Sequence, residues 1–234
     1  MSVFKRDSEN STERASEPVP LPALEEYWPA RAERRDAAQR RRRILDVARG
    51  LFEEYGVERV SLHAVARAAG VGQGTLYRRF EHKGALCSAL LYESMLRFSE
   101  EFRGRVSGGD LTNRPALDAL LGLLESIVRF NEENAALLGA IRASGDERDP
   151  GGQYRGPFYR WLRATVATLL ERAAERGEIP RPDLESVPDA ILAPLGIDLY
   201  LFQRQDLGLT PERILRSLES LLTDGLRGAY YPST

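Results

Sequence analysis

The chain has 234 residues, of which 42% are hydrophobic, and its 33 basic and 35 acidic side chains leave a net charge of −2. This length and composition suit one or two globular domains with a core of ordinary size. We expect neither a membrane span nor secretion, because no apolar run is long enough to cross a bilayer and no secretory signal is visible in the first thirty residues. The single cysteine, Cys87, cannot form an intramolecular disulfide, in agreement with a cytoplasmic location.

The charges are unevenly distributed along the chain. Residues 31–83 carry a net charge of +6, whereas residues 1–30 carry −3 and residues 84–234 carry −5. A basic block inside an acidic chain indicates a part that meets phosphate groups. A solvated helix face has the same composition, so charge alone does not separate the two interpretations.

The N-terminal region, residues 1–35, is polar and contains Pro18, Pro20, Pro22 and Pro29 without any sustained periodicity. We therefore expect a disordered tail. From residue 36 onward, apolar residues recur at helical spacing, and they predict a first helix that ends at Gly56.

Two short helices follow the first one. Ser61 is the expected N-cap of the second helix, and Gly70 is the expected stop, since glycine adopts the positive φ of a sharp turn between helices. The third helix is predicted over 72–80. Together these segments predict a three-helix, helix-turn-helix domain over residues 36–83.

The rest of the chain, residues 84–234, is expected to form a helical regulatory and dimerisation domain. A fourth helix is predicted over 83–103, followed by a turn at 107–110 and by a loop at 146–156 further on. Pro194 and Gly196 should kink the helix that contains them. No alternating pattern flanked by hairpin turns occurs, so the fold class is all-α. Further helices are predicted near 115–131, 134–143, 157–177, 187–204 and 211–228.

The third helix has the surface of a DNA-reading helix. Its outward positions carry hydrogen-bonding groups and cations, with no carboxylate before Glu81. Gln and Arg side chains have the geometry to read base edges in the major groove, whereas Tyr77 and Lys83 suit phosphate contacts. The candidate DNA-contacting residues are Arg41, Arg42, Arg43, Ser61, Gly72, Gln73, Thr75, Tyr77, Arg78, Arg79 and Lys83.

The arginines at 40–43 directly precede the apolar stripe of the first helix. We interpret them as an arm that runs along the phosphates or into the minor groove, because they adjoin the helix-turn-helix. A solvated helix start is the alternative.

The segment GVGQGTLYRRFEHKGAL resembles the signature of the tetracycline-repressor (TetR/AcrR) family of transcriptional regulators. The resemblance is close over residues 37–90, and it departs from the family at Gly72, where a Ser or Thr cap is usual, and at Gln73. The matching positions are Gly70, Val71, Leu76, Tyr77, Phe80, Lys83 and Leu86. It implies a homodimer paired through the last two long helices and a small-molecule effector bound in the regulatory domain.

Candidate regulatory residues follow from the helical pattern of the second half. Trp161, Thr165 and Tyr200 are polar or aromatic groups among apolar neighbours, and we expect them to line an effector pocket. Exposure to solvent or to a dimer partner is the alternative for each. The candidate dimer-interface residues, for which burial within the monomer is the competing account, are Leu195, Leu199, Phe202, Leu218, Leu221 and Leu222.

The expected function is therefore a ligand-responsive transcriptional repressor that binds a palindromic double-stranded DNA operator as a homodimer. The alternative is a helical protein-interaction module whose basic patch binds an acidic partner without sequence-specific DNA binding. An enzyme is not expected, because no nucleophile–base–acid grouping stands out. No cofactor or metal site is indicated, since His63 and His82 lack companion ligands.

Overall fold

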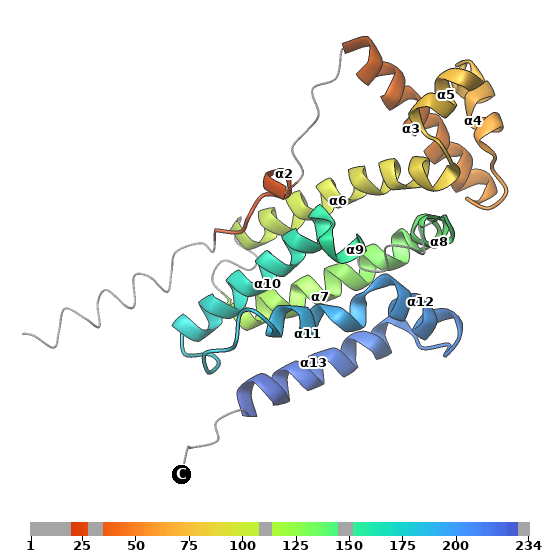
Figure 1. Ribbon diagram of the computed structural model, residues 1–234. Helices are drawn as coiled ribbons and strands as arrows, with labels where there is room; N and C mark the ends of the chain where they lie inside the picture. Colours follow the sequence, from red (N-terminus) through yellow and green to blue (C-terminus); the bar gives the residue numbers. More distant parts are fainter. Residues whose placement is uncertain (1–19, 28–34, 108–113, 145–151, 229–234) are drawn as a thin grey trace, which may run out of the picture.

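The computed structural model describes residues 20–27, 35–107, 114–144 and 152–228. Within these ranges the regular elements are helices and no strand occurs, so the predicted all-α fold class is confirmed (Figure 1). A small group of N-terminal helices stands at one end of the molecule, and a larger helical body forms the rest. We call these parts the head and the body.

The head consists of three helices, α3 (Arg35–Tyr55), α4 (Leu62–Ala69) and α5 (Gln73–Arg79). α3 ends as predicted, because Gly56 adopts a φ of 83° and its N–H donates to the carbonyl of Phe52 at 2.9 Å. The head has its own apolar cluster, so it folds around a separate small core. The fully buried members include Ile44, Leu45, Ala48, Val65, Ala66, Ala69 and Leu76.

The long helix α6 (Lys83–Ser107) joins the two parts. Its first turns place Leu86, Cys87 and Leu90 in the core of the head, and its later turns place Phe98 and Phe102 in the core of the body. One continuous helix therefore contributes to both cores, and a shift of α6 in the body also shifts the head.

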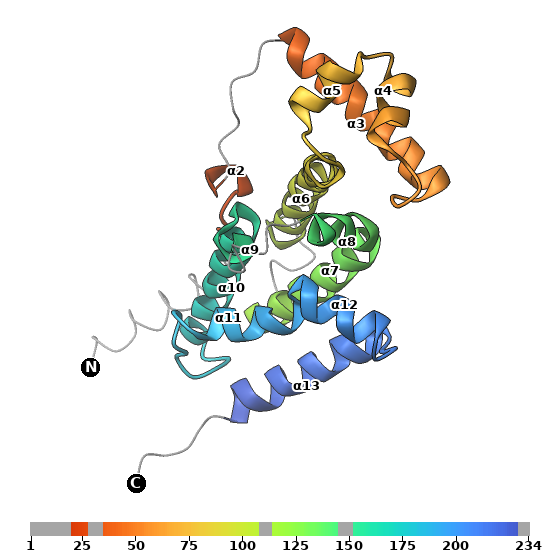
Figure 2. The ribbon, with the colours of Figure 1, turned by 45° about the vertical axis from the view of Figure 1, so that its right-hand side comes forward.

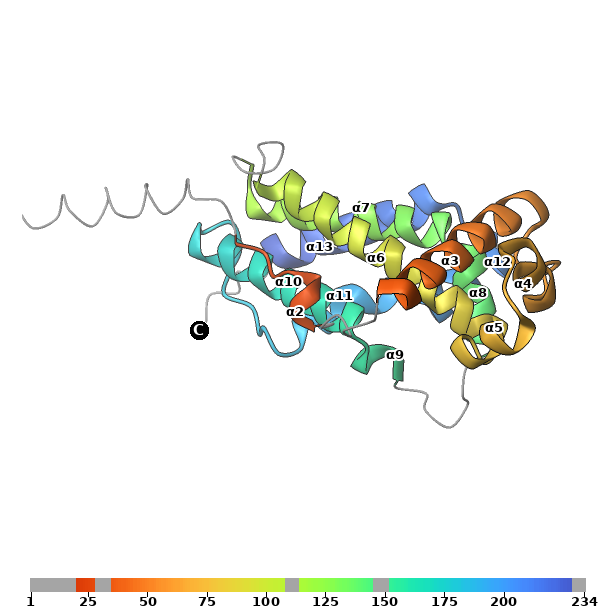
Figure 3. The same ribbon diagram turned by 90° about the horizontal axis from the view of Figure 1, so that it is seen from above.

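The body is built around α7 and α10, which pack against each other, with α13 on the other side of α7 (Figures 2 and 3). α8 packs along α6 and links the head-proximal end of the body to that helix. The helices that follow α6 are α7 (Ala116–Glu133), α8 (Ala135–Ala143), α9 (Gly152–Arg155), α10 (Pro157–Glu175), α11 (Val187–Leu192), α12 (Ile197–Gln205) and α13 (Pro211–Gly228).

The predicted kink at Pro194 and Gly196 is confirmed. A short 3-10 turn, η1 (Ala193–Leu195), separates α11 from α12. Such a break frees backbone carbonyls, and the buried side chain of Asn131 donates from Nδ2 to the Leu195 carbonyl at 3.0 Å. The break is thus held by α7.

The structure differs from the expected N-terminal tail at residues 20–27; the other parts of that tail, 1–19 and 28–34, lie outside the described residues. α2 (Leu24–Tyr27) is a single helical turn against α10, and Leu24 is fully buried. The indole Nε1–H of Trp161 donates to the carbonyl of Pro22 at 2.9 Å. A four-residue helix is too short for a periodic pattern, so no local signal predicts it. Similarly, α9 (Gly152–Arg155) lies within the expected loop 146–156, of which residues 146–151 lie outside the described ranges.

Candidate nucleic-acid interface

The corner between α4 and α5 has the predicted geometry. The side chain of Ser61 caps α4 by accepting a hydrogen bond from the N–H of Ala64 at 3.2 Å. Gly70 ends α4 with a φ of 64°, and the N–H of Val71 donates to the carbonyl of Ala66 at 3.0 Å. The left-handed glycine and these capping bonds therefore help to fix the angle between the two helices.

α5 presents a polar, cationic face to solvent. Leu76 is fully buried and Phe80 is 4% exposed, so these two side chains anchor the helix to the core of the head. Gln73, Tyr77 and Arg78 are exposed on the opposite side, while Thr75 and Arg79 are half-buried. The helix contains no carboxylate, so nothing on it repels phosphate.

The start of α5 offers a bare backbone. No side chain caps the helix at Gly72, and the N–H of Thr75 donates to the Gly72 carbonyl at 2.9 Å instead. A Cβ at Gly74 would meet no heavy atom within 4 Å, so open space lies in front of it. A missing side chain at this point allows another molecule to approach the main chain closely.

Gln73 and Arg78, the candidate base-reading residues, contact groups of the protein itself. The side-chain amide of Gln73 hydrogen-bonds Nδ1 of His63 on α4, and Nε of Arg78 donates to the Gly74 carbonyl at 3.2 Å. His63, which has no companion metal ligands in the sequence, lies ten residues from Gln73 on a different helix. To read bases, both side chains must exchange these contacts for contacts with DNA.

The arginines at 40–43 are not an extended arm, because α3 begins five residues earlier, at Arg35. These arginines lie within the first helix, and their expected contacts along the phosphates or into the minor groove stay a prediction. Arg42 and Arg43 are exposed, and Arg41 is half-buried. Arg43 lies over the corner between α4 and α5, since a Cβ at Gly70 would stand 3.2 Å from its Nη2. The cations thus border the helix-turn-helix from α3.

Lys83 has a structural role that the sequence analysis missed. Its half-buried ammonium group donates to the carbonyls of Val57 at 3.0 Å and Glu58 at 3.2 Å. These bonds attach the start of α6 to the turn after α3. A phosphate contact by Lys83 remains a prediction, and it would use the donor capacity that these two bonds leave.

The candidate effector residues lie in the packed core of the body. Trp161, Thr165 and Tyr200 are all fully buried, and their polar atoms are satisfied internally. Thr165 Oγ1 donates to the Trp161 carbonyl at 2.9 Å, and the Tyr200 hydroxyl donates to Glu132 Oε1 at 2.9 Å. None of the three lines the cleft described next, so their role in binding an effector stays a prediction.

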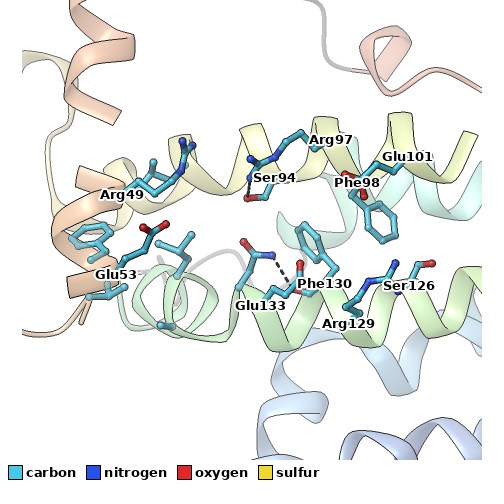
Figure 4. Close-up of a pocket in the computed structure, with 16 residues that line it drawn as sticks. Arg49, Glu53, Ser94, Arg97, Phe98, Glu101, Ser126, Arg129, Phe130 and Glu133 are labelled. Atoms are coloured by element: carbon cyan, nitrogen blue, oxygen red, sulfur yellow. Dashed lines mark hydrogen bonds between the residues drawn. The ribbon is translucent and has the colours of Figure 1, made fainter. Parts of the chain in front are cut away.

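A cleft of about 490 Å³ lies where the head meets the body (Figure 4). Its walls come from the second half of α3, the middle of α6, the end of α7 and the start of α8. Its apolar lining includes the nearly buried rings of Phe52, Phe98 and Phe130. The cleft is therefore lined by both the head and the body, and α6 runs from one to the other.

Three helices each contribute an arginine and, four residues later, a glutamate to this cleft. Arg49 forms an ion pair with Glu93 of α6, which fastens the head to the body. The spacing of an arginine and a glutamate four residues apart can be seen in the sequence of each predicted helix. The sequence does not show that the three helices meet at one cleft. The pairs are Arg49 and Glu53, Arg97 and Glu101, and Arg129 and Glu133.

The candidate dimer residues fall into three groups by exposure. Leu195 and Leu218 are 4% and 7% exposed and belong to the core of the monomer, so the structure corrects their placement at an interface. Leu222 is half-buried at the edge of the same core. The exposed apolar side chains of α12, α13 and the turn between them are Leu199 at 43%, Phe202 at 46%, Leu221 at 70% and Leu207 at 55%, the last of which was not among the predicted interface residues.

Over the described ranges, no helix is both long enough and apolar enough to cross a membrane.

Models of known protein families match both the head and the body. Residues 44–90 match the model of bacterial regulatory proteins of the tetR family, and residues 114–217 match that of the tetracyclin repressor-like C-terminal domain. An HTH-type transcriptional regulator of Staphylococcus aureus (strain USA300) is 33% identical over 129 residues, which are 55% of this chain and 66% of the relative. The alignment thus spans just under two thirds of that relative.

Solved structures of similar fold cover most of the chain. Thermus thermophilus FadR, a TetR-family transcriptional repressor solved in complex with lauroyl-CoA, is 21% identical with a TM-score of 0.63, over 83% of this chain and 98% of its own. NalD, the secondary repressor of the MexAB-OprM multidrug efflux pump in Pseudomonas aeruginosa, is 24% identical with a TM-score of 0.55, over 82% and 99%. These likenesses show the fold. Because the head and the body each match a tetracycline-repressor model, the chain belongs to the TetR family of bacterial regulatory proteins.

Proposed function

We propose that the protein is a ligand-responsive transcriptional repressor that binds a near-palindromic DNA operator as a homodimer. The observation that supports this most directly is the exposed face of α5. It carries Gln73, Tyr77 and Arg78 without a carboxylate, and the α4–α5 corner holds it at a fixed angle. A short helix with this surface fits the major groove.

The side chains of α5 divide by the contacts that they can make. Arg78 and Gln73 offer paired donors or a donor and an acceptor, the geometry that distinguishes one base edge from another. Tyr77 offers one hydroxyl, which suits a phosphate oxygen and fixes the register of the helix. Arg41, Arg42 and Arg43 lie on the neighbouring helix α3, where they add phosphate contacts that do not depend on sequence.

We assign the effector site to the cleft between head and body. A molecule bound there touches α3 of the head as well as α6 and α7 of the body. Its affinity therefore depends on the angle between the two parts, and a ligand that prefers one angle shifts the population toward it. A volume of about 490 Å³ is in the usual range for small-molecule sites.

The test is to select genomic DNA fragments bound by the full chain and to map the bound site by nuclease protection. We expect one near-palindromic sequence to be recovered, bound much more tightly than random duplex of the same length at the same salt concentration. Salt-dependent binding to all duplexes alike would contradict the proposal and favour a basic interaction module for an acidic partner.

A further inference from the structure

The side chain of Gln73 has a partner on the neighbouring helix. Its amide nitrogen hydrogen-bonds Nδ1 of His63, the second residue of α4, and Gln73 itself is the first residue of α5. Both side chains are exposed, and the two helices lie side by side in the head (Figures 1 and 2). The contact therefore joins two side chains on the exposed surface of the helix-turn-helix.

His63 stands on a firmly packed helix. Leu62 beside it is 7% exposed, and Val65, two residues further on, is fully buried in the core of the head. The residues on either side of Gln73 are glycines, so its immediate neighbours offer the amide no side-chain partner. The amide of Gln73 is thus held from α4 rather than by the residues next to it on α5.

The chemistry of the amide makes this contact compete with base reading. The amide nitrogen of a glutamine can only donate, so Nδ1 of His63 is the acceptor and the ring proton is on Nε2. A glutamine that reads a base presents its amide oxygen and an N–H together to one base edge. When Gln73 turns its amide toward a base, it gives up His63. The base and the histidine therefore compete for the same group.

This competition reduces discrimination between bases in two ways. With a matching base, the hydrogen bond to His63 is lost, so only the difference between the two contacts is gained. With a base that offers no matching group, Gln73 keeps its bond to His63. No amide is then left unpaired in the interface, although an unpaired buried polar group is what most strongly disfavours a wrong partner.

We propose that His63 makes the operator position that faces Gln73 tolerant of different bases. His63 holds the amide when the base does not match and competes for it when the base does. It acts through Gln73, so it is a positioning residue for base reading. This role rests on the proposed function, because it requires an operator that α5 reads. Removal of the ring nitrogen should therefore sharpen the sequence preference at that position.

The decisive variant is His63→Leu, which keeps a bulky side chain on α4 and removes the ring nitrogens. Binding sites are selected from random duplexes by the full-length wild type and by the variant. Gln73→Ala identifies the operator position that Gln73 reads, since the preference at that position is lost. The ratio of affinities for the preferred and the next-best base there should rise about three- to tenfold in His63→Leu. Effects on all sequences alike, such as a lost phosphate contact, cancel in this ratio.

Two further variants control for the bulk and the route of the effect. His63→Gln keeps a polar side chain that can hold the amide, so its affinity ratio should stay near that of the wild type. In the Gln73→Ala background, His63→Leu should leave the sequence preference unchanged, because the two residues are coupled only through the amide. Without DNA, the side-chain amide resonances of Gln73 should shift in His63→Leu. They are identified by their absence from the spectrum of Gln73→Ala.

The outcomes separate this role from the proposed function. An affinity ratio that His63→Leu leaves unchanged or lowers overturns the role of His63, even if the wild type selects an operator. An equal loss of affinity for every sequence also overturns it and makes His63 a phosphate contact. A wild type that selects no operator contradicts the proposed function, and the role of His63 falls with it whatever the resonances of Gln73 show.

Discussion

Gly70 is the residue on which the shape of the head depends most directly. Its φ of 64° is a left-handed conformation that costs a residue with a Cβ about 1–2 kcal/mol. A Cβ there would also stand 3.2 Å from Arg43 Nη2, so the arginine would have to move. We expect Gly70→Ala to reduce the free energy of unfolding by about 1–2 kcal/mol, measured by urea denaturation.

Gly74 supplies the matched control. It is helical, and a Cβ there meets no heavy atom within 4 Å. Gly74→Ala should therefore stabilise the protein by about 0.5–1 kcal/mol, since alanine loses less backbone entropy in a helix. Equal losses of stability in both variants would show that the left-handed corner is not what Gly70 provides.

Arg78 and Tyr77 test the division of labour on α5. We expect Arg78→Ala to relax base preference at one or two operator positions and to cost about 1–3 kcal/mol of binding free energy. Tyr77→Phe should lower affinity for every sequence without changing the preferred one, because it removes a single phosphate contact. Sites selected in parallel by the wild type and by both variants give the comparison. The reverse pattern would exchange the two roles, and no effect of either would remove α5 from the interface.

At the scale of elements, α7 and α12 are joined by one charged network. Arg204 on α12 donates to Glu132 on α7 through Nε at 2.8 Å and Nη2 at 2.9 Å, and the hydroxyl of Tyr200 donates to the same carboxylate. The hydrogen bonds from Arg204 are the main reason that the pKa of Glu132 lies below its ordinary value. The charged form of Glu132 is thus favoured by folding.

This network predicts a pH-dependent contribution to stability. Because the pKa of Glu132 is lowered in the folded state, the contribution is complete above the unfolded pKa, about 4.3, and is lost as the pH falls through the lower folded pKa. Glu132→Gln should cost about 1 kcal/mol at neutral pH, and the difference from wild type should shrink in acid. Urea denaturation between pH 3 and pH 7 measures it.

The neighbouring Glu133 provides the control for this measurement. Glu133 is exposed, and its side chain forms no hydrogen bond or ion pair with the described residues. Glu133→Gln should leave the stability nearly unchanged throughout the range. A parallel loss in both variants would mean that net charge, rather than the link to Arg204, is responsible.

Local signals explain which elements were predictable. Ser61, Gly56 and Gly70 act on the residues next to them, so the bounds of α3, α4 and α5 could be read from the sequence. α2 is held by Trp161, which lies more than a hundred residues away, and no pattern within four residues reveals such a contact.

The candidate sites also differ in whether they depend on local sequence signals or on contacts between distant segments. The exposed positions of α5 follow from helix periodicity and from two buried anchors, whereas the cleft exists only where α3, α6, α7 and α8 converge. Leu218 and Leu221 look alike in the sequence, three residues apart on one amphipathic helix. Packing of α13 on α7 buries the first and leaves the second 70% exposed.

The exposed apolar side chains on α12 and α13 predict the oligomeric state of the protein. Phe202 on α12 and Leu221 on α13 are 46% and 70% exposed, and both helices lie on the same side of the body (Figures 1 and 2). Exposed apolar side chains on these two helices mark a candidate interaction surface, and a second copy of the chain is the partner that a palindromic operator requires. We expect a dimer at micromolar concentration by light scattering.

Charge substitutions separate interface from core. Phe202→Glu and Leu221→Lys should yield a monomer with unchanged helix content by circular dichroism. Operator affinity should fall with them, because a monomer reaches only one half-site. Leu218→Lys should instead unfold the protein, since that side chain is buried in the monomer.

Arg216→Glu, an exposed charge reversal on the same helix, controls for surface charge and should leave the dimer intact. A wild type that is monomeric, or a dimer that survives both substitutions, would place the pairing surface elsewhere.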